Sequence, residues 1–228
     1  MKSNVMRLAG WIALAALSVG VSVYAIGVYG FLPLGALLHP DMRAAFQAHP
    51  ISVYAHVFAA AVALSLGPLQ FSSRLRTSHI KLHRWSGRAY LGVGVLVGGF
   101  AGLYMSLHAF GGIVSRLGFG CLALAWLFTG LRAFLAIRRR DVASHRRWMV
   151  RNFALAFAAV TLRLYLPSSI AMGVAFEVAY PVIAWLCWLP NVLVAELIFN
   201  RRHHRVLQPT AAGGPSLDTR AHTDRRPL

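Results

Sequence analysis

Residues 51–71 read ISVYAHVFAAAVALSLGPLQF and contain no Asp, Glu, Lys or Arg. A membrane-spanning helix needs about 20 mostly apolar residues, because the hydrocarbon core of a bilayer is about 30 Å thick. The segment that follows has no acid and carries the basic residues Arg74, Arg76, Lys81, Arg84 and Arg88. This order, an apolar run and then a basic segment, is typical of a membrane span that ends in a positively charged loop.

The same alternation extends over the whole chain of 228 residues, of which 57% are hydrophobic and only 13% are charged. A soluble domain has about 25% charged residues, so most of this chain has no polar face for water. We therefore predict an all-α, polytopic transmembrane bundle of six helices that forms one domain over residues 1–200. The expected spans are residues 8–31, 51–71, 85–107, 114–137, 148–166 and 174–199.

The first apolar segment has an alternative interpretation as a signal peptide. Lys2 and Arg7 precede it, and Val23 with Ala25 could form a small-residue cleavage site. However, the apolar stretch is longer than the usual signal core of about 7–15 residues. We therefore expect a retained first helix.

Arginine and lysine are concentrated in alternate loops, and this asymmetry sets the expected orientation. The second-to-third and fourth-to-fifth connections and the tail are rich in these residues, whereas the opposite loops carry only Arg43 and Arg116. Because positive loops stay in the cytoplasm, we expect both termini there (N-in, C-in), in a bacterial inner membrane. The net charge of +17 is confined to these segments, which argues against a nucleic-acid-binding surface.

Residues 201–228 contain Arg, Pro, Gly, Ser and Thr and little apolar material. Such a segment cannot bury enough apolar surface to offset the entropy lost on ordering. We predict a disordered, basic cytoplasmic tail. The expected partners of the protein are the lipid bilayer and, at its basic segments, anionic lipid headgroups.

Four histidines lie in two pairs near the ends of the expected spans. His56 follows the start of the span 51–71, and His108 follows the end of the span 85–107, so antiparallel helices would bring them together. His83 and His145 lie at the other face, near the starts of the spans 85–107 and 148–166. Imidazole is a good iron ligand, and a bundle interior can hold an apolar macrocycle. The layout therefore predicts two bis-histidine sites for haem b.

Arg84, Arg88 and Arg151 lie beside the second pair and could neutralise haem propionates. The alternative is that each histidine is structural and hydrogen-bonds a loop carbonyl or lies among headgroups. His79 and His83 have the spacing of a divalent-metal site, but no carboxylate is near in sequence, so no metal site is predicted.

Arg163 is a charged residue inside the span 148–166. Arginine within a span usually faces the bundle or a polar cavity, and Glu177 is a candidate partner for it. The alternative is that its side chain extends to the headgroups at the membrane surface.

Two short segments have the same order of residues, which suggests an internal repeat. His83, Trp85 and Arg88 in one segment correspond to His145, Trp148 and Arg151 in the other, and an aromatic residue follows each segment. The alternative is chance similarity between arginine-rich loops. In either case we expect the tryptophans to lie at the membrane interface.

Four motifs occur in order along residues 51–166: His56 with Gly67-Pro68-Leu69-Gln70-Phe71, His83-Arg84-Trp85 with Gly87-Arg88, His145-Arg146-Arg147-Trp148-Met149 with Arg151, and Thr161-Leu162-Arg163. This set resembles a bacterial family of predicted membrane proteins, the domain of unknown function 2306. The resemblance implies an integral membrane protein and no established activity. The histidine layout is also loosely similar to di-haem transmembrane b-type cytochromes, but the fourth span departs from that pattern because it has no histidine.

The sequence has no Walker loop, dinucleotide-binding glycine motif, nucleophile elbow or zincin motif, so it gives no support for a particular enzyme class. The leading hypothesis is a haem b electron carrier. The first alternative is a non-enzymatic membrane module that binds anionic lipid or a protein partner through its basic loops. The second is a small-molecule permease with a cavity at Arg163.

Overall fold

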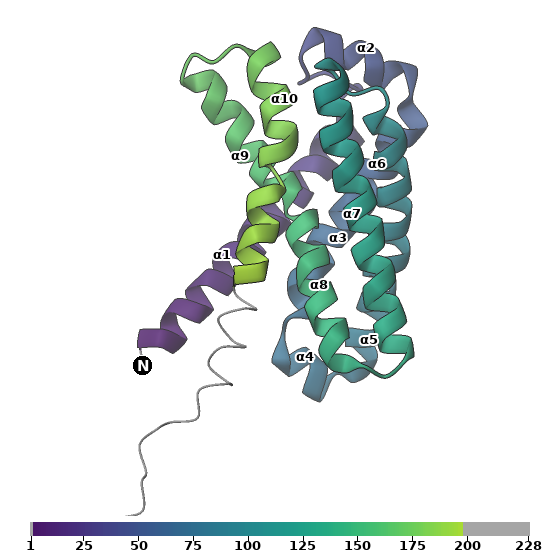
Figure 1. Ribbon diagram of the computed structural model, residues 1–228, viewed down its shortest axis with the longest axis vertical. Helices are drawn as coiled ribbons and strands as arrows, with labels where there is room; N and C mark the ends of the chain where they lie inside the picture. Colours follow the sequence, from purple (N-terminus) through teal and green to yellow (C-terminus); the bar gives the residue numbers. More distant parts are fainter. Residues whose placement is uncertain (1, 198–228) are drawn as a thin grey trace, which may run out of the picture.

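The computed structural model describes residues 2–197, and this part of the chain is helical and has no strand (Figure 1). Its elements are α1 (Lys2–Phe31), α2 (Pro40–Ala48), α3 (Pro50–Gln70), α4 (Ser73–Ser78), α5 (Ile80–Ala89), the π-helix η1 (Tyr90–Val97), α6 (Gly98–Ser106), α7 (Gly112–Arg138), α8 (Val142–Ala156), α9 (Ala158–Ala171) and α10 (Phe176–Leu186).

The structure confirms the prediction of six helices that are long and apolar enough to cross a membrane. They are Leu8–Phe31, Pro50–Gln70, Ile80–Ser106, Gly112–Arg138, Val142–Ala171 and Phe176–Leu197. The third and fifth helices begin several residues before the predicted starts at 85 and 148. Their first turns are polar, so the hydropathy of the sequence did not include them in the predicted spans. The end of the predicted sixth span (198–199) and the predicted tail (201–228) lie outside the described residues.

Local signals in the sequence explain where several helices begin. Pro40 and Pro50 occupy the first turns of α2 and α3, where proline has no hydrogen bond to lose and its fixed φ suits a helix. Asp141 caps α8, since its Oδ1 accepts a 2.9 Å hydrogen bond from the backbone N–H of Ser144. Hydrogen bonds from Ser144 also hold the pKa of the Asp141 carboxyl below its ordinary value.

Helix α3 and the third span approach each other closely along a seam of small residues. A Cβ added at Gly94 would lie 2.8 Å from the Cβ of Ala63, and one added at Gly98 would lie 3.3 Å from the Cβ of Ala59. Small residues let membrane helices pack with their backbones close together. The glycines therefore fix the distance between these two spans.

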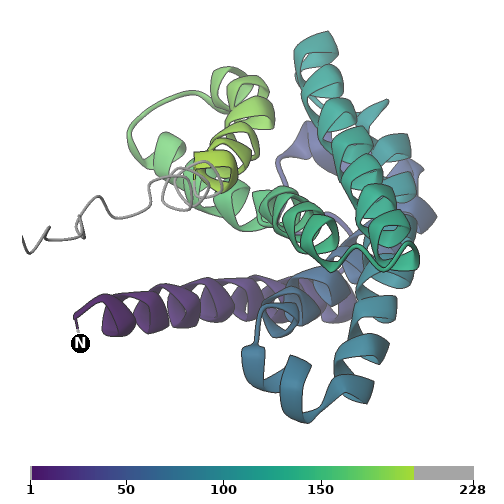
Figure 2. The same cartoon turned by 60° about the horizontal axis from the view of Figure 1, so that its bottom comes forward.

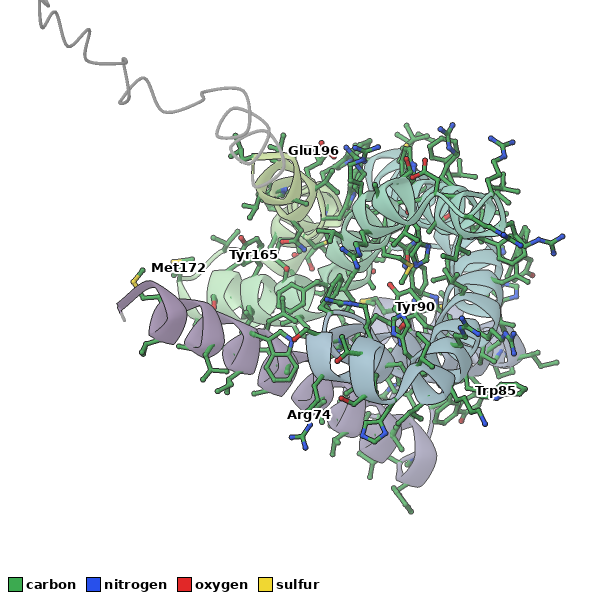
Figure 3. The ribbon with its side chains drawn as sticks, turned by 90° about the horizontal axis from the view of Figure 1, so that it is seen from below. Arg74, Trp85, Tyr90, Tyr165, Met172 and Glu196 are labelled. Carbon is green, nitrogen blue, oxygen red and sulfur yellow. The ribbon has the colours of Figure 1, made fainter. Side chains whose placement is uncertain are left out.

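A buried hydrogen-bond network connects η1, α7 and α8. The hydroxyl of Tyr90 donates to Oδ1 of Asn152 over 2.8 Å. The side-chain amide of Asn152 donates to the carbonyl of Trp126 (2.7 Å) and to the hydroxyl of Thr129 (2.9 Å). Tyr90 and Asn152 are fully buried. Figure 3 shows Tyr90 inside the bundle and Trp85 at its periphery. Because every polar group of the asparagine has a partner, the network tolerates burial and holds three spans together.

The two ends of the bundle differ in charge. One end carries α4 and the turn between α7 and α8, with their arginines Arg74, Arg76, Arg138, Arg139 and Arg140, and we call it the basic end. The other end carries α2 and the turns at 107–111 and 172–175, and we call it the α2 end. Figures 1 and 2 show that α9 stands apart from α3 and α6 and that α1 crosses the bundle obliquely, whereas α10 packs on α7.

Candidate functional site

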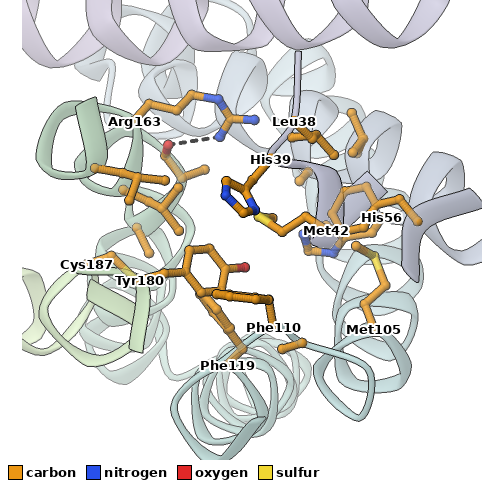
Figure 4. A pocket seen from close by; sticks show the side chains of 18 of the residues that line it. Leu38, His39, Met42, His56, Met105, Phe110, Phe119, Arg163, Tyr180 and Cys187 are labelled. Carbon is orange, nitrogen blue, oxygen red and sulfur yellow. Dashed lines mark hydrogen bonds between the residues drawn. The ribbon is translucent and has the colours of Figure 1, made fainter. Parts of the chain in front are cut away.

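A cavity of about 1430 Å³ lies between α9 and α10 on one side and α3 and α6 on the other, and α7 also contributes to its wall. Pockets for drug-sized ligands usually have about 300–1,000 Å³, so this cavity can hold a larger molecule. Its wall is mainly apolar and aromatic, with contributions from Phe110, Phe119, Trp126 and Tyr180 (Figure 4). The polar groups on the wall are few, and the most distinctive belong to His39, His56, His108 and Arg163.

The seam between α3 and α6 sets the position of the His56 ring. Nδ1 of His56 lies 2.8 Å from the carbonyl oxygen of Gly98, at the point where the π-helix ends. Gly102 has no side chain to occupy the same place: a Cβ there would lie 2.7 Å from Nδ1 of His56. Since a carbonyl only accepts, Nδ1 carries the proton and donates it. In the neutral ring Nε2 then keeps its lone pair, and no residue in 2–197 hydrogen-bonds to it.

Arg163 is held by neutral groups. One Nη donates to the carbonyl of Ala159 over 3.0 Å, as the dashed line in Figure 4 marks, and the guanidinium lies 5.9 Å from the centre of the Tyr24 ring. Among the side chains that the structure describes, no carboxylate forms an ion pair with it. The candidate partner Glu177 instead lies 3.9 Å from His39, with 61% of its side chain exposed. The guanidinium of Arg163 is thus a cation on the mainly apolar wall of the cavity.

The first predicted histidine pair shares this cavity, because His56 and His108 both line it. The His108 ring, however, stacks on His49, with a centroid distance of 4.0 Å and an interplanar angle of 26°. His49 also contacts the hydroxyl of Tyr104 through Nδ1 at 3.2 Å. His108 therefore belongs to an aromatic cluster at the rim, whereas His56 lies on the seam.

The second predicted pair lies at the basic end and does not line the cavity. His83 and His145 are close enough for their charges to interact. Nδ1 of His145 donates to the carbonyl of Ala133 over 2.9 Å, the same arrangement as at His56. Nδ1 of His83 is buried and has no hydrogen-bond partner among residues 2–197.

The arginines near this pair have aromatic or acidic neighbours. Arg88 lies over the ring of Trp85 at 5.0 Å, and Arg151 lies over the ring of Trp148 at 4.8 Å. The two similar segments thus have the same local geometry, a tryptophan and an arginine one turn later. Arg151 also forms a bidentate ion pair with Glu196, through its Nε and through a 2.8 Å bond from Nη2. Arg84 directly follows His83 in α5, and its charge acts on that histidine.

Sequence reasoning did not identify several cavity residues. His39 precedes α2 in a connecting segment, but it lines the cavity, and its ring stacks on Phe176 with a centroid distance of 4.5 Å. Tyr24 and Tyr180 face the cavity from the first and last spans. The hydrophobic period of a span does not reveal these positions, because lipid and an apolar cavity favour the same residue types.

A family model described as predicted membrane protein (DUF2306) matches residues 53–199. The chain belongs to this family. The matched region includes His56, His108 and Arg163, whereas α1, α2 and His39 precede it. No curated protein and no solved structure matches the chain. This DUF2306 protein is a multi-pass membrane protein.

The seam predicts a specific effect of substitution at Gly102. Gly102→Leu should displace the His56 ring and lower the free energy of unfolding by about 1–3 kcal/mol, because the added side chain overpacks the contact. Thermal unfolding in detergent and chemical modification of His56 by diethyl pyrocarbonate would measure both effects. Gly92→Leu is the matched control, since a Cβ there meets nothing within 4 Å. Equal thermal stability and equal modification of His56 in the two variants would contradict the close packing of Gly102 against His56.

Proposed function

We propose that this DUF2306 protein binds a large amphipathic anion within the membrane, with its apolar part in the cavity and its anionic group at Arg163. The observation that carries the proposal is a guanidinium on the cavity wall with no carboxylate partner among the described side chains. A charged side chain deep in a span costs about 2.5–3.5 kcal/mol, so a cation without a counter-ion suggests a functional site.

The chemistry of the guanidinium favours a carboxylate or a phosphate. Arginine has five N–H donors in a planar fork that matches such groups in a bidentate manner. One donor is used by the carbonyl of Ala159, and Tyr24 contributes a ring face rather than an acceptor. The remaining donors suit a charge-assisted pair with a ligand, and the aromatic wall suits its apolar body.

A thermal-shift measurement tests this proposal. Oleate, a simple long-chain carboxylate, should raise the unfolding temperature of the detergent-purified protein, since a ligand at about 100 times its Kd stabilises the folded state by about 2.7 kcal/mol. Arg163→Gln should abolish most of this stabilisation. Arg116→Gln is the matched control, because it removes the same charge from an exposed position outside the cavity. An equal oleate response in all three proteins would refute the anionic site.

Haem b is a second candidate ligand for the same cavity, and the hydrogen bond of His56 to Gly98 favours it. Histidines that ligate metals usually donate the other ring N–H to a carbonyl or carboxylate, which leaves a lone pair for the metal. In His56, Nδ1 donates to the carbonyl of Gly98, and Nε2 keeps the lone pair that could bind a metal. Haem is itself a large amphipathic anion, so His56 with His108 would hold its iron and Arg163 would pair with a propionate. Bound haem would supply one-electron redox chemistry.

The proposal for a second haem concerns the basic end. His83 and His145 would be its ligands, and the carbonyl bond of His145 supports this role. Arg84, Arg88 and Arg151 would lie near its propionates, although Arg151 already pairs with Glu196. Two haems at opposite ends would allow electron transfer across the membrane.

An absorption spectrum before and after reduction with dithionite tests the haem proposal. A haem protein purified from haem-sufficient cells should show a sharp reduced α-band at near-stoichiometric amounts. His56→Ala should remove the contribution of the cavity site, and His145→Ala that of the basic end. His79→Ala is the control, because His79 belongs to neither pair. A colourless protein would rule out haem and leave the anionic ligand as the proposal.

We also propose that the protein lies in a bacterial inner membrane with its basic end in the cytoplasm, where the arginines contact anionic lipid. A single cysteine at Ala44, in a variant without native cysteines, should then react with an impermeant maleimide in intact spheroplasts. A cysteine at Arg74 should react only after permeabilisation. The reverse pattern would show the opposite orientation.

A further inference from the structure

We propose that the ligand enters the cavity sideways from the lipid, through an opening between α1 and α9. This inference rests on the proposed function, because it concerns the route of the ligand to Arg163. It also specifies the ligand class: a single-chain amphiphile that is dissolved in the bilayer before it binds.

The cavity wall has exposed residues in two places: at the α2 end, among them Leu37, His108 and Val174, and along two of the spans, where they mark the proposed opening. On α1 they are Gly20 and Tyr24, and on α9 they include Leu164, Pro167 and Ile170. All five lie within candidate membrane spans, Leu8–Phe31 and Val142–Ala171. An opening bordered by residues at this depth faces hydrocarbon chains rather than water.

The chemistry of this rim agrees with its position. Glycine, leucine, proline and isoleucine carry no polar side-chain atoms, and Tyr24 is an amphipathic residue with half of its side chain exposed. A passage for a water-soluble solute would need polar groups along it, because a polar solute must keep hydrogen-bond partners. A passage for an alkyl chain needs none.

The packing of α1 leaves room for such a passage. Helix α1 packs mainly on α3 and makes far less contact with α9. A Cβ added at Gly20 would meet no atom within 4 Å, so this side of α1 faces open space. Figure 2 shows α9 and α10 on one side of this region and α1 on the other.

Arg163 lies where an entering headgroup would stop. It is half-buried, lines the cavity, and lies beside Tyr24 of the opposite helix. The buried part of the wall, which includes Ala123, Trp126 and Ala158, lies further inside. An amphiphile would thus place its anionic group near the opening and its chain in the interior.

The test uses radiolabelled oleate and the full-length protein in nanodiscs. Gly20→Phe should place a ring in the opening and slow both association and dissociation by about tenfold, as expected when binding requires a conformational change. Gly27→Phe is the matched control, because Gly27 also lies on α1 with no atom within 4 Å of an added Cβ, but does not line the cavity. Thermal unfolding would verify that both variants fold.

The outcomes separate the route from the function. If Gly20→Phe slows both rates while Gly27→Phe and the wild type bind alike, and Arg163→Gln loses affinity, the lateral route is supported. If Gly20→Phe exchanges oleate as fast as the wild type, the route is wrong although the anionic site stands. If the wild type and Arg163→Gln both fail to bind oleate, the proposed function and the route fail together.

Discussion

The close approach of α3 to the third span is the contact on which the candidate site depends. Gly94 and Gly98 meet Ala63 and Ala59 at distances that leave no room for a larger side chain. In a membrane, helix association relies on such packing, because lipid offers apolar side chains the same environment as a protein interior. The seam brings the carbonyl of Gly98 to the ring of His56 and so fixes the tautomer of that ring.

The two ends of the bundle use their polar groups differently. Near the basic end, Tyr90 and Asn152 satisfy each other inside the bundle, and Arg151 is neutralised by Glu196. Toward the α2 end, α10 packs on α7 but α9 diverges from α3 and α6, and a large cavity remains between them. The satisfied polar groups stabilise the fold, whereas Arg163 has only the carbonyl of Ala159 and the Tyr24 ring as described partners.

The same cavity is proposed for both candidate ligands because they share an apolar body and an anionic group. They differ in the use of His56: haem would require its Nε2, whereas a long-chain carboxylate would require only Arg163 and the wall. Substitution of His56 therefore distinguishes them, whereas substitution of Arg163 would weaken the binding of both. The apolar rim on α1 and α9 adds a physical reason to expect a lipid-soluble ligand.

The sequence by itself determined the six spans, the basic loops, the family and the unusual charge at Arg163. These are local properties, since hydropathy over about 20 residues and the placement of arginine do not depend on neighbouring helices. Only the tertiary structure decided that Glu177 pairs with His39, that His108 stacks on His49, and that Arg163 faces a cavity. Those outcomes depend on how the helices cross and diverge. Apolar lining and lipid-facing surface have the same composition, so no pattern along the chain could distinguish them.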